Sequence, residues 1–75
     1  MQQELFDDCP THIDSSKMSY GEFMLMKYPD ETYSVWFREN GHIGVHSGKR
    51  RFKDEPTARM FLCNCIISGF SVADL

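Results

Sequence analysis

Two pairs of residues in this chain have spacings that could serve to bind zinc. Cys9 and His12 are separated by two residues, and Cys63 and Cys65 by one. A closed zinc site takes four such ligands, usually supplied by two tight turns. Residues two apart on a helix point in directions about 200° apart, however, and the sequence predicts a helix around Cys63. We therefore expect ordinary buried thiols, with no metal and no cofactor.

Residue types that perform catalysis are present, but not in catalytic patterns. No serine lies in a nucleophile-elbow context, and no glycine-rich loop could hold a phosphate. No cysteine has a visible histidine base beside it. The pairs of neighbouring acidic residues fall in an expected arm, turn and helix cap, where solvation and capping explain them. The sequence predicts a protein that is not an enzyme.

The basic residues are concentrated late in the chain, whereas the first sixteen residues carry acidic side chains and no lysine or arginine. A three-stranded sheet packed on one helix is an arrangement that some DNA-binding domains use, and a basic run could contact phosphates. The net charge of −3 favours a solvated strand end that balances the acidic region. Nucleic-acid binding is therefore the alternative function, and its candidate residues are Lys49, Arg50, Arg51 and Lys53.

Length and composition indicate one folded domain with a small core. The 75 residues are 41% hydrophobic, which is typical of a globular protein, but a chain of this size is marginally stable without a partner. No apolar run is long enough to cross a membrane, and we expect no secretion signal and no membrane partner. The three cysteines are an odd number, which favours a reducing, cytoplasmic setting.

An Asn40-Gly41 pair between two runs of alternating apolar and polar residues is a strong hairpin signal. It predicts strands over residues 32–38 and 42–47, after a first strand over 20–28. A helix over 55–67 follows, with Asp54 as its cap and Gly69 at its end. We expect an irregular acidic arm over residues 1–18. Residues 19–75 should form an α+β domain, in which a three-stranded antiparallel meander packs against one C-terminal α-helix.

The register of the hairpins decides which side chains face the helix. A three-residue loop over 39–41 pairs Phe37 with Ile43 and Val35 with Val45, which gathers apolar residues on one face. An even-numbered loop around Pro29-Asp30 would add residues 24, 26 and 28 to that face. The helix should pack there.

The opposite face of the predicted sheet combines apolar, aromatic and basic side chains. Its predicted partner-binding residues are Phe23, Leu25, Trp36, Arg38, His42 and His46. Tryptophan and arginine are enriched in protein-binding hot spots, so this face is our candidate site. As an alternative, Leu5, Phe6 and Ile13 would fold back over the face and turn it into a second small core.

The predicted helix is apolar on more than one side, because Met60, Cys63 and Ile67 form a second row. A sheet covers only one side, so we expect a second copy of the chain, a partner or the N-terminal arm to cover the other. The sequence thus predicts a small non-enzymatic protein-binding module with a protein partner. By analogy with other small stand-alone proteins, it would be a regulator or inhibitor of a host protein complex, encoded by a phage or mobile element.

Overall fold

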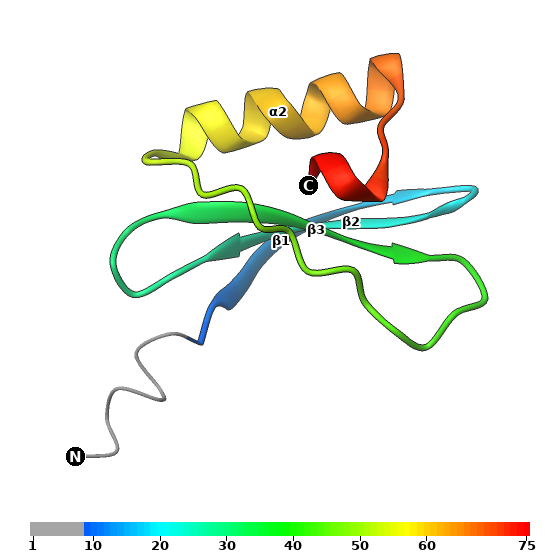
Figure 1. Ribbon diagram of the computed structural model, residues 1–75, viewed down its shortest axis with the longest axis horizontal. Coiled ribbons are helices and arrows are strands. Elements are labelled where there is room, and N and C mark those ends of the chain that lie inside the picture. Colours follow the sequence, from blue (N-terminus) through cyan, green and yellow to red (C-terminus); the bar gives the residue numbers. More distant parts are fainter. Residues whose placement is uncertain (1–8) are drawn as a thin grey trace.

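The computed structural model describes residues 9–75 and has two layers, a sheet and a helix (Figure 1). Three antiparallel strands lie in the order β1-β2-β3: β1 is Thr11–Met18, β2 is Gly21–Lys27 and β3 is Tyr33–Glu39. The helix α2, Glu55–Ser68, lies across one face of the sheet, and a short 3₁₀ helix, η1, covers Val72–Asp74. The predicted α+β class, with a three-stranded antiparallel sheet and one C-terminal α-helix, is confirmed.

The sheet contains a strand at its N-terminal end that was not predicted. Residues 11–18, expected to belong to an irregular arm, form the edge strand β1, so the sheet begins at Thr11 and not near residue 19. This strand is almost entirely exposed. Without a buried face it needs no alternation of apolar residues, and its composition therefore resembles that of a loop. The part of the predicted arm that covers residues 1–8 lies outside the described residues.

The turn at Asn40-Gly41 forms, but the strand predicted after it does not. Gly41 has the positive φ of 86° that favours glycine, and the His42 amide donates to the Glu39 carbonyl over 3.0 Å. The chain then bulges outward, so that Phe37 exchanges backbone hydrogen bonds with His46 instead of Ile43. Ile43 is fully exposed. The predicted pairing of residues 35 and 37 with 45 and 43 is wrong.

The chain after His46 runs beside the outer edge of β3. Its second contact is Phe52, which exchanges two backbone hydrogen bonds of 2.8 Å with Tyr33. Between the two bridges, the backbone passes so close to β3 that a Cβ atom on Gly48 would lie 2.0 Å from the Val35 carbonyl oxygen. Only glycine permits this approach, and the segment covers the edge of the sheet without being a regular strand.

The loop between β2 and β3 sets the register of the core. The amide of Tyr28 donates to the Thr32 carbonyl, and Glu31 donates back to Tyr28, which leaves a three-residue loop with Glu31 at a φ of 71°. An odd loop shifts the pairing by one residue from the even loop we predicted. Phe23 therefore pairs with Phe37, and Leu25 with Val35. The predicted faces of β2 are exchanged.

The core lies between α2 and the face of the sheet that carries Phe23 and Leu25. The helix begins where the Asp54 carboxylate accepts the Thr57 amide at 2.9 Å, and it ends before Gly69, whose φ is 85°. The predicted helix over 55–67 is confirmed to within one residue. Its buried side chains recur at helical spacing and point toward the sheet. They are Ala58, Leu62 and Cys65.

An ion pair joins the edge strand to the helix. The Arg59 guanidinium donates to an Asp14 carboxylate oxygen at 2.8 Å and to Glu55 at 2.7 Å. The hydrogen bond from Arg59, followed by the one from the Ser15 amide, lowers the pKa of Asp14. This pair joins β1, most of whose residues are exposed, to the helix.

Replacing Gly48 with alanine should destabilise the fold, because the new Cβ would overlap the Val35 carbonyl. We expect Gly48→Ala to lower the free energy of unfolding by about 2–3 kcal/mol. Gly44→Ala is the matched control: its Cβ meets nothing within 4 Å, so the change should stay within about 1 kcal/mol. Urea unfolding of both variants measures this, and equal stabilities would show that the segment does not dock on β3.

Removing the Asp14 carboxylate should lower stability in a pH-dependent way. A carboxyl group whose pKa is lower in the folded than in the unfolded chain stabilises the fold above its unfolded pKa and loses that effect as the pH falls. Asp14→Asn should therefore lower the melting temperature at neutral pH. The difference from the wild type should shrink as the pH falls from the usual pKa of aspartate toward the lowered pKa of Asp14. A difference that is the same at acidic and neutral pH would contradict this account.

Candidate functional site

The face of the sheet opposite α2, which we call the outer face, is the candidate site. Side chains alternate along each strand, so the cross-strand register places them in rows. One row joins Lys17, Glu22 and Arg38, and the next joins residue 15, Met24 and Trp36. Met24 and Trp36 are partly exposed, so an apolar centre lies beside a charged row.

The indole of Trp36 is held in place by hydrogen bonds along the outer face. Its Nε1 donates to Ser34 Oγ at 2.9 Å, and the Ser34 hydroxyl reaches the Tyr28 hydroxyl at 3.5 Å. Ser34 is fully buried, so its hydroxyl forms a fixed acceptor. The ring therefore loses little conformational freedom when it binds a partner, which is a property of good anchor residues.

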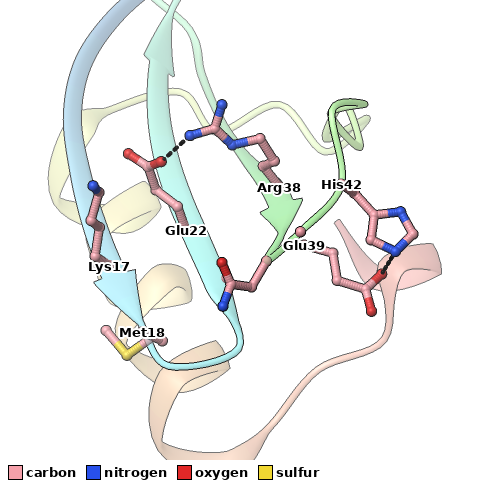
Figure 2. Close-up of a pocket in the computed structure, with 9 residues that line it drawn as sticks. Lys17, Met18, Glu22, Arg38, Glu39 and His42 are labelled. Carbon is pink, nitrogen blue, oxygen red and sulfur yellow. Dashed lines mark hydrogen bonds and ion pairs between the residues drawn. The ribbon is translucent and has the colours of Figure 1, made fainter.

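Three cationic side chains surround this centre. Arg38 pairs with Glu22 at 2.7 Å (Figure 2), whereas Lys17, which lies beside Glu22, forms no ion pair with any described residue. Arg51 lies over the Tyr28 ring, 3.4 Å from its centroid. It also contacts an Asp30 carboxylate oxygen at 3.6 Å. Since Glu22 and Asp30 pair with two of these cations, the excess positive charge of the outer face comes from Lys17.

A shallow cleft of about 240 Å³ continues the outer face at the end of the strands (Figure 2). The backbone N–H of Asn40 donates to the Tyr20 carbonyl at 2.9 Å, and the side-chain amide of Asn40 donates to the Ser19 carbonyl at 3.2 Å. These bonds fasten the two hairpin ends together. Lys17, Arg38 and His42 line the cleft with Glu22 and Glu39, and a peptide segment that crosses Trp36 could extend into it.

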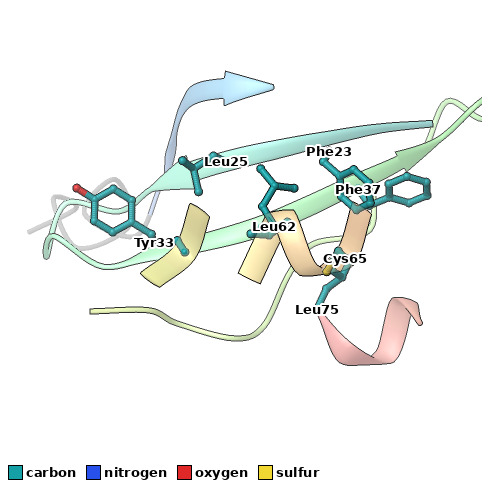
Figure 3. Close-up of a cluster of buried hydrophobic side chains, with 9 residues drawn as sticks. Phe23, Leu25, Tyr33, Phe37, Leu62, Cys65 and Leu75 are labelled. Carbon is teal, nitrogen blue, oxygen red and sulfur yellow. The ribbon is translucent and has the colours of Figure 1, made fainter. Parts of the chain in front are cut away.

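The structure brings together only part of the predicted site. Trp36 and Arg38 lie on the outer face, and His42 lines the cleft at its end. Phe23 and Leu25 were predicted wrongly, because both are completely buried against α2 (Figure 3).

His46 also lies away from Trp36. It stacks beside Phe37, with 6.4 Å between ring centroids, and Phe37 belongs to the core on the helix side. The three-residue loop between β2 and β3 sets the register that turns Phe23 and Leu25 toward α2. The wide loop after Gly41 brings His46 opposite Phe37, and so onto the helix side of the sheet.

Two residues of the outer face, Lys17 and Met24, were not among the predicted site residues. Both would have followed from the register in which Glu22 lies between two basic residues, since opposite charges across strands stabilise a pairing. These charges are present in the sequence, but the register that aligns them could be found only by predicting β1 as a strand. It also required a three-residue loop in which Glu31 has a positive φ.

The basic run divides between two sides of the molecule. Arg50 lies on the helix side, where its guanidinium is 5.5 Å from the Phe61 ring centroid and donates to the Asp74 carbonyl at 2.6 Å. Arg51 lies against Tyr28 on the outer face. Successive residues of an extended segment point in opposite directions, so the run does not form one continuous cationic surface.

The cysteines of α2 have different surroundings. Cys65 is 4% exposed in the core, and burial, with a smaller contribution from Asp74, raises the pKa of its thiol. Cys63 is exposed on the opposite side of the helix. Among residues 9–75, no three histidine, cysteine or acidic side chains are grouped as a metal site would require.

Of the three N-terminal residues that could have covered the outer face, only Ile13 lies in the described part of the chain. Ile13 lies in β1, at the shift in register between His12 and Asp14, and stays 39% exposed. It therefore does not fold back over Trp36. Leu5 and Phe6 lie outside the described residues.

Within residues 9–75, neither the length nor the apolar character of any helix suffices to cross a membrane. Comparison of the chain with protein-family models, with curated proteins and with solved structures gave no match.

The two thiols of α2 should react at very different rates. In a Cys9→Ser background, we expect Cys63 to be alkylated at least about tenfold faster than Cys65, because burial keeps the Cys65 thiol protonated and inaccessible. Mass spectrometry of iodoacetamide-treated protein measures both rates. Cys63→Ser should leave no rapidly reacting thiol, and equally fast labelling of Cys65 would refute its placement in the core.

Proposed function

We propose that this protein is a small protein-binding module that docks through the outer face, with Trp36 as its anchor. The supporting observation is a tryptophan fixed by Ser34 at the centre of the face that α2 leaves uncovered. Met24 extends its apolar surface, and Arg38 lies in the next row. An aromatic anchor with arginine nearby is the composition of binding hot spots.

The charges around Trp36 favour a partner with an acidic surface. Lys17 has no ion pair among the described residues, and Arg51 remains partly exposed although Asp30 is close. Carboxylates of the partner would meet these cations at the rim, while an apolar group would cover Trp36. The protein would regulate or inhibit its target by occupying that surface, without catalysis.

Nucleic-acid binding has weaker support. A surface that follows a phosphate backbone needs cations along one path, but Arg50 and Arg51 lie on opposite sides of the sheet. Glu22 also stands between the two cations of its row. A partner with apolar and carboxylate groups fits this mixture of charges better than a polyanion does.

Replacing Trp36 with alanine should weaken partner binding by at least about tenfold, which corresponds to ~1.4 kcal/mol. The immobilised protein first captures its partner from extracts of its native cells, and calorimetry with the purified partner then measures the affinity. Lys17→Gln removes this positive charge without placing a second glutamate opposite Glu22, so it should weaken binding several-fold with little change in the melting temperature. Ile43→Ala is the control, since Ile43 is fully exposed and belongs to no strand of the sheet.

Salt dependence and a second set of variants distinguish the two functions. Docking around Trp36 should persist at high salt, whereas phosphate contacts weaken steeply. If Trp36→Ala binds its ligand as the wild type does while Lys49→Glu/Arg50→Glu abolishes binding, the outer face is not the docking surface. Nucleic-acid binding then becomes the better explanation.

A further inference from the structure

One side of α2 is uncharged and largely exposed in the described part of the chain. Met60 is 66% exposed and Ile67 is 80% exposed, and Cys63 and Asn64 lie exposed between them. These four residues, which we call the helix stripe, follow the spacing of one helix face. They point away from the sheet, opposite the buried row that includes Leu62.

The helix stripe carries no charge. The charged residues within α2 are Glu55 and Arg59, which pair with each other and with Asp14 toward the edge of the sheet. A surface helix normally presents charged or polar residues on the side opposite its core. An uncharged stripe along a 14-residue helix therefore indicates a surface that is covered in the functional protein.

We propose that a second copy of this chain covers the helix stripe, in a two-fold symmetric dimer of antiparallel α2 helices. A two-fold interface must be self-complementary, and the helix stripe has this property. Its large side chains, Met60 and Ile67, stand at the ends, and the smaller Cys63 and Asn64 stand in the middle. With the axis between positions 63 and 64, Met60 of each copy packs against Ile67 of the other.

Two further features favour a second copy over an unrelated partner. The helix stripe offers no charged group that a different protein could recognise, and two identical neutral stripes meet without repulsion or unpaired charge. Antiparallel packing also opposes the two helix dipoles favourably. The small central residues allow the helix axes to approach to about 8–10 Å.

The size of the helix stripe limits the strength of this dimer. A 14-residue helix is about 21 Å long, and one side of it offers less than the ~800 Å² per partner of a standard interface. The dimer is therefore weak and depends on concentration. Because the helix stripe and the outer face lie on opposite sides of the molecule (Figure 1), the dimer leaves both copies of Trp36 accessible. Such a dimer would bind bivalently.

Sedimentation velocity over a wide range of concentrations tests the dimer, using the full chain and one matched pair of variants. Wild type should shift from the mass of one chain toward that of two as the concentration rises. Ile67→Lys should remain monomeric, because it would bury an unpaired cation against the apolar Met60 of the second helix. Ile43→Lys makes the same substitution at a fully exposed site outside the helix stripe and should dimerise like the wild type.

Crosslinking gives a second, independent measurement. A short bismaleimide should join two chains through Cys63 when Cys9 is replaced by serine, and Cys63→Ser or Ile67→Lys should abolish the crosslinked species. A mass of one chain at every concentration would overturn the proposal. A dimer that survives Ile67→Lys would also overturn it, since the interface would then lie elsewhere.

Discussion

The pairing of Phe23 with Phe37, and of Leu25 with Val35, is the constraint on which the rest of the structure depends. A shift of one residue would turn both β2 side chains to the solvent and bring Met24 into the core. The three-residue loop with Glu31 in the left-handed region fixes this register. The same pairing places Glu22 beside Arg38 and Met24 beside Trp36, so the loop determines the composition of the outer face as well as that of the core.

Two local contacts, the close backbone approach at Gly48 and the hydrogen bond of Trp36, add to what the small core provides. The segment after Gly41 covers the outer edge of β3 through only two bridges, and Gly48 permits the closest approach between them. This arrangement protects one edge of the sheet without another strand. On the outer face, Ser34 gives Trp36 its hydrogen bond, so a large aromatic ring remains partly exposed but fixed in orientation.

The two uncovered surfaces differ in chemistry, and the difference separates their proposed roles. The outer face combines Trp36 with cations such as Lys17, which suits an acidic partner of a different sequence. The helix stripe from Met60 to Ile67 is neutral and symmetric in size, which suits a copy of itself. The helix stripe is on the side of α2 that faces away from the sheet, and the outer face is on the other side of the sheet, so one chain can use both surfaces at once.

The sequence by itself determined the fold class and the helix, because capping by Asp54, the end at Gly69 and the spacing of apolar residues are local features. It also identified Trp36 and Arg38 as neighbours, since their separation along one strand places them on the same face in any register. Only the tertiary structure decided that Phe23 and Leu25 are core and that β1 exists. Register depends on the number of residues in a loop and on which strand occupies an edge. Neither a glutamate at positive φ nor a polar edge strand carries the local pattern that would reveal it.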